Sequence, residues 1–535
     1  MAGGTFDFLE DRWPPLAKVA DTAEKNIYQD PNTAISKFRL FAETMTKYIL
    51  AFEEVDEPYG MSQLDRLRLL YQEQILPRSI NDLFQMIRMT GNKATHEALY
   101  GTVEEAKTIH RTAYQLATWY MEVYGDWNFE VPPYQEPKET QLISSEEVDE
   151  LAKQYQAKLD AMEQELMDIR KQQTTVETES KQRRKQIAYR LAAQLEPTEQ
   201  QTRKLIDQQL SLANWEVDTE TIRYPKGARP EYGKNKAIAE WPLKGRYADY
   251  ALFIGMKLVG IVEAKKESKD VYSAVSQAKD YAKLIVQKGE EEIFEPWGDC
   301  YVPFLFATNG RPYQKQLEQK SGIWFLDVRL STNHPKALQG WYTPEGLKNL
   351  LEQDREKAEQ KLDDEKFDYL NLRDYQVEAI QAIEQAIRNE QREILIGMAT
   401  GTGKTRMAIG LIYRLIKSGR FNRVLFLVDR KALGEQAEAA FKDSKIEKED
   451  TFYQIYNLQT LEDKVPEKET KVQIATVQGM LKRLFSTDEK SKLTIDQYDC
   501  VIVDEAHRGY TLDREMSEFE LKFRDHHDYV SKYRQ

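Results

Sequence analysis

The sequence predicts a multidomain protein in which an α-helical N-terminal domain is followed by two α/β domains. Three observations lead to this prediction. Apolar and aromatic residues recur at helical spacing over the first 130 or so residues, short β-rich runs follow between about residues 187 and 340, and apolar strands alternate with helices from about residue 370. The 535 residues leave room for several domains. With 41% hydrophobic and 31% charged residues, the chain is expected to be globular.

The first domain is expected at residues 1–130 and a helical linker at residues 140–186. Helical spacing is clearest at residues 34–52, 64–76 and 103–124, and the proline-containing stretch 127–137 is typical of a linker. Within the linker, apolar residues follow a heptad from Val148 to Ile169 among charged ones, which predicts a long exposed helix or a coiled coil. Such a helix could serve as a spacer or docking arm, or pack along its own domain.

Charge and cysteine content narrow the class of protein. The formal net charge of −13 argues mildly against a protein that coats nucleic acid, and two distant cysteines argue against a disulfide framework or a zinc site. No apolar run reaches membrane-spanning length and the start lacks a signal segment, so the cytoplasm is the expected compartment. One basic segment could either line a groove that binds DNA or form a solvated loop. It contains Arg223, Lys226, Arg229, Lys234, Lys236, Lys244 and Arg246 against two acids, Glu231 and Glu240.

The middle domain, expected at residues 187–340, carries charged residues beside two predicted strands. Asp249 precedes the strand at residues 250–254, and Glu263 and Lys265 end the next one. Residues two apart on a strand share a face. A short turn between the strands would pair them antiparallel and bring Asp249 beside Glu263.

Two carboxylates and an ammonium group that lie close together are a set of side chains that can catalyse phosphodiester hydrolysis. Asp249 and Glu263 would bind Mg²⁺, which activates water and stabilises charge at the phosphorus, while Lys265 would orient that water or neutralise the developing charge. A helix at residues 202–207 offers a further acid, Asp207. The alternative is a surface salt bridge between Glu263 and Lys265 on an edge strand.

This set of residues resembles the PD-(D/E)xK nucleases. The resemblance extends to Gln277 and Tyr281, which match the Gln-x-x-x-Tyr element of those members that are fused to helicases. It implies catalytic roles for Gln277 and Tyr281 as well. The family usually has proline before the first aspartate, where this chain has Ala248.

The last block, residues 370–535, contains a loop that fits nucleotide phosphates. It follows a strand predicted at residues 394–396 and precedes a helix. Its glycines allow backbone N–H groups to close on phosphate oxygens, Lys404 would reach the β- and γ-phosphates of ATP, and Thr405 would place a hydroxyl on Mg²⁺. The phosphate-binding residues are Thr400, Gly401, Thr402, Gly403, Lys404 and Thr405.

The acidic partner of this loop ends an apolar strand about a hundred residues later. There Asp504 would hold Mg²⁺ through a water molecule, and Glu505 would activate the attacking water. With these motifs the block resembles the first RecA-like lobe of superfamily 2 helicases and translocases. The resemblance implies that Gln376 reads adenine. It also implies a second lobe that this sequence does not contain, so weak ATP binding and little turnover are expected.

A motif in the first domain resembles the Arg-x-x-Gly-Asn-x-Ala-x-His signature of small HEPN-like helical domains. It runs from Arg88 to His96, and some members of that group cleave RNA with this arginine and histidine. The spacing here is wider than is usual for those ribonucleases. A docking or structural role is therefore favoured, with Asn92 and His96 capping or bridging helices.

The order of helical domain, nuclease and motor lobe resembles the restriction subunit of type I restriction–modification enzymes, here ending after the first lobe. The resemblance implies ATP-driven translocation of double-stranded DNA coupled to Mg²⁺-dependent cleavage. It also implies modification and specificity subunits as partners that select the target. Two alternatives remain: a stand-alone helicase–nuclease of DNA repair, and a non-catalytic chain that only docks to the methyltransferase core.

Overall fold

The chain forms two compact units, residues Met1–Trp341 and Tyr342–Gln535. The structure is a computed structural model. It describes residues 4–57, 60–97, 100–125, 129–139, 178–192, 195, 198–265, 271–310, 321–330, 332–447, 450–461, 466–484 and 493–506. The predicted heptad from Val148 to Ile169 lies outside these residues.

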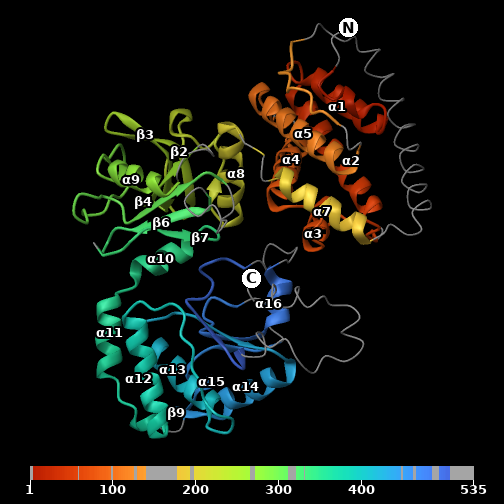
Figure 1. The fold of residues 1–535 in the computed structure, drawn as a ribbon. Helices are drawn as coiled ribbons and strands as arrows, with labels where there is room; N and C mark the ends of the chain where they lie inside the picture. Colours follow the sequence, from red (N-terminus) through yellow and green to blue (C-terminus); the bar gives the residue numbers. More distant parts are fainter. Residues whose placement is uncertain are drawn as a thin grey trace. The chain divides into compact units, whose positions relative to one another are not determined.

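The first unit begins with a helical head, as the sequence predicts (Figure 1). Aromatic side chains such as Trp13, Phe38 and Trp119 fill its core. Each long helix presents apolar residues at helical spacing, so the helices bury their apolar faces against one another. Its elements are η1 (Asp7–Leu9), α1 (Pro14–Asn26), α2 (Pro31–Phe52), α3 (Gln63–Gln72), α4 (Arg78–His96), α5 (Val103–Tyr124) and α7 (Thr178–Ala192).

Two segments expected to be linkers are attached to the head. Residues 129–139 lie against it, because the hydroxyl of Tyr28 donates a hydrogen bond to the carbonyl of Pro137 at 2.8 Å, and that of Tyr114 donates to Pro132. The helix α7 packs on α5, where Ala188 enters the core and accepts a hydrogen bond from the indole of Trp119 at 3.3 Å. Proline-rich composition alone therefore did not distinguish a free linker from a segment that wraps its own domain.

The rest of the first unit is a mixed seven-stranded sheet in the order β1-β2-β3-β4-β5-β6-β7. The helix α9 (Val271–Ala282) packs on β4, β5 and β6, while α8 (Glu199–Leu212) contacts Tyr250 of β3. The pairs β1–β2 and β4–β5 are parallel and the others antiparallel. The strands are β1 (Glu216–Val217), β2 (Asn235–Leu243), β3 (Arg246–Ile254), β4 (Lys257–Ala264), β5 (Phe304–Thr308), β6 (Ile323–Asp327) and β7 (Lys336–Leu338), with the short helix η2 (Tyr224–Lys226) before β2.

The predicted antiparallel hairpin of β3 and β4 is confirmed. The turn between them contains Gly255 at φ 59°, a conformation that glycine adopts without strain. One boundary differs from the prediction, because β3 begins at Arg246, so Asp249 lies within the strand rather than ahead of it.

The second unit contains a parallel sheet in the order β11-β12-β8-β13, flanked by helices (Figure 1). The charged stretch at residues 343–366 forms two helices, which meet near Asp354, the N-cap of the second. The elements are α10 (Pro344–Glu352), α11 (Arg355–Asp364), η4 (Asp368–Leu370), α12 (Asp374–Arg388), α13 (Lys404–Ser418), β8 (Val424–Val428), α14 (Lys431–Asp443), β9 (Lys445–Glu447), β10 (Asp450–Thr451), α15 (Phe452–Ile455), β11 (Leu458–Gln459), β12 (Val472–Thr476), α16 (Val477–Leu484) and β13 (Cys500–Val503).

The strand predicted at residues 394–396 is absent, and this prediction was wrong for the described structure. The segment has no regular secondary structure, and Leu395 is 91% exposed. Among the described strands, β13 pairs only with β8, and its Val501 is 52% exposed. An apolar run becomes a strand only when a neighbour accepts its backbone hydrogen bonds.

Candidate functional site

The two predicted carboxylates meet at the open end of the β3–β4 hairpin. Tyr250 pairs with Val262, so the next residues outward, Asp249 and Glu263, face each other across the two strands. The backbone N–H of Ala264 donates a hydrogen bond to Asp249 Oδ2 at 2.8 Å. The hairpin itself thus brings the two acids together, as the sequence predicts.

Lys265, Gln277 and Tyr281 form one hydrogen-bonded chain beside these acids. Lys265 Nζ lies 2.7 Å from Glu263 Oε1 and 2.6 Å from Gln277 Oε1. The amide of Gln277 donates to the hydroxyl of Tyr281 at 2.7 Å, one turn further along α9. The five residues that carry the resemblance to the PD-(D/E)xK nucleases therefore form one cluster.

The environment of the cluster favours proton uptake in the absence of a cation. Burial, followed by the negative charge of Asp249, raises the pKa of Glu263 to about 7, although Lys265 opposes the shift. Burial also raises the pKa of Asp249. Glu263 is 4% exposed, and its Oε2 has no hydrogen-bond partner among the residues that the structure describes. A buried carboxylate oxygen of this kind calls for a proton or a cation.

The donor set fits Mg²⁺ better than a metal that needs a full cage of side chains. In the described part of the chain, no group of three or more His, Cys, Asp or Glu side chains could hold a metal ion. Mg²⁺ commonly binds through one or two carboxylates and completes its octahedron with water and phosphate oxygens. Asp249 and Glu263 offer that minimal pair.

Asp207 does not join the cluster, and its expected role as a further acid was wrong. Its carboxylate accepts hydrogen bonds from the backbone N–H of Thr219 at 2.8 Å and from the hydroxyls of Thr219 and Tyr250 at 2.6 and 2.9 Å. These bonds satisfy the buried carboxylate and tie α8 to the sheet. Asp207 therefore has a structural role.

The residue of α8 that does reach the acids is Arg203, which sequence reasoning missed. Its Nη2 lies 3.3 Å from Asp249 Oδ1 and its Nη1 lies 3.3 Å from Glu240 Oε1. Glu240 has a φ of 52° within β2 and also accepts a hydrogen bond from Arg223. A single sequence gives no signal for Arg203, because its role depends on how α8 is rotated against the sheet.

The basic segment around β2 separates into paired and exposed residues. Arg223 pairs with Glu240, and both Lys234 and Lys236 pair with Glu231. Two others, Lys244 and Arg246, are exposed at the β2–β3 turn, where the Arg246 guanidinium lies 6.0 Å from the ring centre of Tyr281. Positive charge thus remains exposed beside the acidic cluster.

In the second unit, the phosphate-type loop has the backbone that the glycines predict. Gly401 and Gly403 both have φ of 80°, and α13 begins directly after them at Lys404. The loop is closed by Gln376, whose amide nitrogen donates to the carbonyls of Thr402 at 2.9 Å and Gly403 at 3.2 Å. Gln376, expected to read adenine, is therefore engaged with the loop itself.

The acidic strand lies opposite the loop lysine. Lys404 Nζ is 2.8 Å from Glu505 Oε1, and the backbone N–H of Asp504 donates to the carbonyl of Leu427 at 2.9 Å. Thr405 follows Lys404 in the first turn of α13. His507, two residues after Glu505, lies outside the described residues.

The HEPN-like signature contributes to packing in the head. A Cβ at Gly91 would lie 2.6 Å from the side chain of Arg39, so glycine permits the close approach of α2 and α4. The C-terminal end of α4 is capped by Asn32, whose amide donates to the carbonyls of Ala94 and Glu97. His96, predicted to cap or bridge helices, is exposed.

No helix in the described parts of the chain combines the length and the apolar character that crossing a bilayer requires.

Two family models match the chain. Residues 216–351 match the second domain of the type I restriction enzyme EcoKI endonuclease subunit, and residues 369–533 match the res subunit of type III restriction enzymes.

Known proteins with similar sequences include three endonuclease subunits of type I restriction enzymes. The EcoKI subunit of Escherichia coli is 37% identical, over 100% of this chain and 52% of that protein. The EcoAI subunit of Escherichia coli is 26% identical over 47% of the chain and 28% of that protein. The SsaAORF53P subunit of Staphylococcus saprophyticus is 31% identical over 26% of the chain and 14% of that protein. The chain spans about half the length of the EcoKI subunit. Along its whole length, the chain is a homologue of the endonuclease subunits of type I restriction enzymes.

Proposed function

We propose that this chain acts in a type I restriction endonuclease, where its first unit cleaves double-stranded DNA and its second unit is a lobe of the ATP-driven translocase. The observation that carries the proposal is the convergence of Asp249, Glu263, Lys265, Gln277 and Tyr281 in one cluster. The order along the chain, with this cluster before the phosphate loop, is the order expected of the type I family. The homology to the EcoKI endonuclease subunit supports the same function.

In the proposed nuclease reaction, Asp249 and Glu263 would hold Mg²⁺. When bound, Mg²⁺ supplies Lewis-acid activation of water and offsets negative charge at the phosphorus. Lys265 orients the attacking water or neutralises the charge that develops on the phosphate. Gln277 and Tyr281 keep the Lys265 ammonium group in place through their hydrogen-bonded chain.

In the proposed motor, the loop from Thr400 to Thr405 binds the phosphates of ATP. Lys404, which contacts Glu505 in this structure, would reach the β- and γ-phosphates, and Thr405 and Asp504 would hold Mg²⁺. Glu505, released from Lys404, orients the attacking water. Translocation of DNA then brings substrate to the nuclease of the same chain.

The proposed partners are the modification and specificity subunits of a type I complex. The family resemblance assigns target recognition to those subunits. The chain itself contributes cleavage and movement, with ATP and Mg²⁺ as cofactors.

The test uses the enzyme assembled with modification and specificity subunits on a DNA that carries its target. E263Q is expected to lower double-strand cleavage by at least about a hundredfold, the range for loss of a group in the chemical step, while DNA-stimulated ATP hydrolysis continues. K404A is expected to abolish both activities. The matched control, E292Q, changes an exposed glutamate of the same unit and is expected to leave both unchanged.

Three results would count against the proposal. Cleavage by E263Q would remove the nuclease assignment. Degradation of DNA ends by the protein without the other subunits would favour a helicase–nuclease of DNA repair. An assembled complex that neither hydrolyses ATP nor cuts DNA would favour a docking role only.

A further inference from the structure

The helix α8 sends two consecutive side chains to different domains. Arg203 reaches the nuclease acids, with its Nη2 3.3 Å from Asp249 Oδ1. Lys204, the next residue, forms an ion pair with Glu105 of α5 in the helical head. The position of Arg203 at the acids is therefore linked, through one helix, to a contact with the head.

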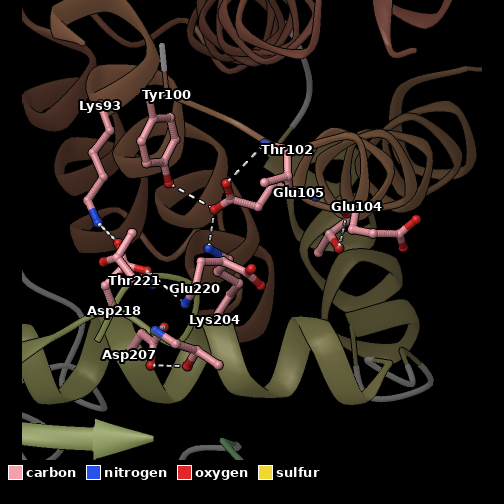
Figure 2. A network of polar contacts seen from close by, with 12 residues as sticks. Lys93, Tyr100, Thr102, Glu104, Glu105, Lys204, Asp207, Asp218, Glu220 and Thr221 are labelled. Carbon is pink, nitrogen blue, oxygen red and sulfur yellow. Dashed lines mark hydrogen bonds and ion pairs between the residues drawn. The ribbon is translucent and has the colours of Figure 1, made fainter. Parts of the chain in front are cut away.

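The contact with the head is buried and built from several partners (Figure 2). Glu105 is 4% exposed and accepts hydrogen bonds from the Tyr100 hydroxyl at 2.9 Å and from the Thr102 backbone N–H at 3.4 Å, besides its ion pair with Lys204. A buried charge that loses its partner strongly destabilises its surroundings. Glu105 therefore has a strong requirement for the ammonium group of Lys204.

A second ion pair joins the same two parts of the unit. Lys93 Nζ of α4 lies 2.7 Å from Asp218 Oδ2, which follows β1 (Figure 2). Asp218 also accepts a hydrogen bond from the backbone N–H of Glu220 at 2.9 Å, so the loop after β1 is ordered around it. Lys93 lies within the HEPN-like signature of the head. One residue of this signature therefore contacts a residue outside the head.

At the nuclease end, Arg203 restrains the acid that it touches. Asp249 Oδ2 is held by the backbone N–H of Ala264, and Oδ1 faces the guanidinium. A metal-binding carboxylate that is also hydrogen-bonded keeps its orientation. Loss of such an outer partner typically lowers metal affinity or activity by roughly ten- to a hundredfold.

We propose that Arg203 is a positioning residue for Asp249, and that the helical head fixes the helix that carries it through the Glu105–Lys204 ion pair. The inference rests on the proposed nuclease function, because it gives Arg203 and the head a role in that reaction. The head thus becomes part of the nuclease rather than a separate module.

Cleavage by the assembled enzyme, measured against Mg²⁺ concentration, tests the role of Arg203. R203M is expected to raise the half-saturating Mg²⁺ concentration or to lower the cleavage rate by about ten- to a hundredfold, with ATP hydrolysis unchanged. R203K keeps a positive charge and is expected to recover part of the loss. The control R183M alters an exposed arginine of α7 and is expected to behave as the unmodified enzyme.

The contribution of the head is tested with neighbouring glutamates of α5. E105Q can keep its hydrogen bonds to Tyr100 and Thr102 but loses the charge that Lys204 needs, so it is expected to shift the Mg²⁺ dependence in the direction of R203M. The control E104Q changes an exposed residue that pairs with Lys107 and is expected to have no effect. If the effect passes through this ion pair, the double variant E105Q/K204Q is no worse than K204Q alone.

The outcomes separate this inference from the proposed function. If E263Q is inactive while R203M cleaves at the rate and with the Mg²⁺ dependence of the unmodified enzyme, or needs less Mg²⁺, the inference on Arg203 fails alone. An effect of R203M without any effect of E105Q removes the role of the head. Full cleavage by E263Q would overturn the nuclease assignment and the inference together.

Discussion

At the scale of single residues, Glu263 is the group whose charge depends most on its surroundings. Its pKa is raised to about 7 by burial and by Asp249, so metal-free protein holds a proton there at mildly acidic pH. By linkage, this shift makes the metal-free fold less stable as pH rises from about 4.5 to about 7. If Glu263 is a ligand of Mg²⁺, as proposed, the metal has to displace this proton, and metal binding then depends on pH.

We therefore expect the Mg²⁺ concentration needed for half-maximal cleavage to rise by up to about tenfold for each pH unit below 7. Cleavage at a fixed low Mg²⁺ concentration falls between pH 8 and pH 6, and added Mg²⁺ restores it. Cleavage rates of the assembled enzyme over a grid of pH and Mg²⁺ concentration measure this. An equal Mg²⁺ requirement at pH 6 and pH 8 would contradict the assignment of Glu263 as a ligand.

Glu505 contacts Lys404 in this structure, whereas its proposed role is to activate the water that attacks ATP. It neutralises Lys404 at 2.8 Å, so ATP has to compete with it for the lysine. E505Q removes that competition. We expect the variant to bind ATP at least as tightly as the unmodified protein and to hydrolyse it at least about a hundredfold more slowly, because it lacks the group that activates water.

Equilibrium binding of a fluorescent ATP analogue and steady-state hydrolysis by the assembled enzyme check this pair of effects. K404A is the reference variant, and it is expected to lose binding as well as hydrolysis. Hydrolysis by E505Q at the normal rate would show that another residue activates the water.

At the scale of elements, we expect the β2–β3 turn to contact DNA near the nuclease cluster. Lys244 and Arg246 are exposed there, and Arg246 lies over Tyr281. Each phosphate contact contributes a slope of about −0.9 to the dependence of binding on salt concentration. A turn that contacts phosphate therefore makes cleavage sensitive to salt.

We expect the double variant K244A/R246A to cleave more slowly and with a shallower dependence on KCl, by an amount equal to about one or two phosphate contacts. The rate of cleavage at several KCl concentrations measures the slope. K234A is the matched control, because Lys234 is already paired with Glu231. If K234A lowers the slope as much as the double variant, DNA does not bind preferentially at this turn.

Whether a strand could be predicted from the sequence depended on whether its run of residues has a pairing partner. Strands such as β3, β4 and β13 were predicted because they have apolar or β-branched runs bounded by turn residues. The run at residues 394–396 has the same composition, yet it pairs with no described strand. Composition reports the tendency to form a strand, whereas the strand itself depends on a partner elsewhere in the chain.

At the scale of the whole molecule, spacing along the chain located the two clusters but not the contacts between domains. Asp249 and Glu263 were placed together because a short turn joins their strands. The Glu105–Lys204 pair spans 99 residues of sequence, and no local pattern connects its two ends. Arg203 was missed for the same reason, since its function depends on the orientation that tertiary contacts give to α8.

Among the residues that the structure describes, β13 is paired on one edge only, with β8, and this has a consequence for the behaviour of the protein in solution. An apolar edge with unpaired backbone groups is a template on which a strand of another chain can add. Leu395 is 91% exposed and Val501 52% exposed in the same unit, so surface suited to such addition is available.

We expect self-association that increases with protein concentration. L395K should weaken it, whereas V131K, at an exposed valine of the head, should not. Light scattering over a concentration series would measure this, and a monomer at every concentration would mean that the edge is protected.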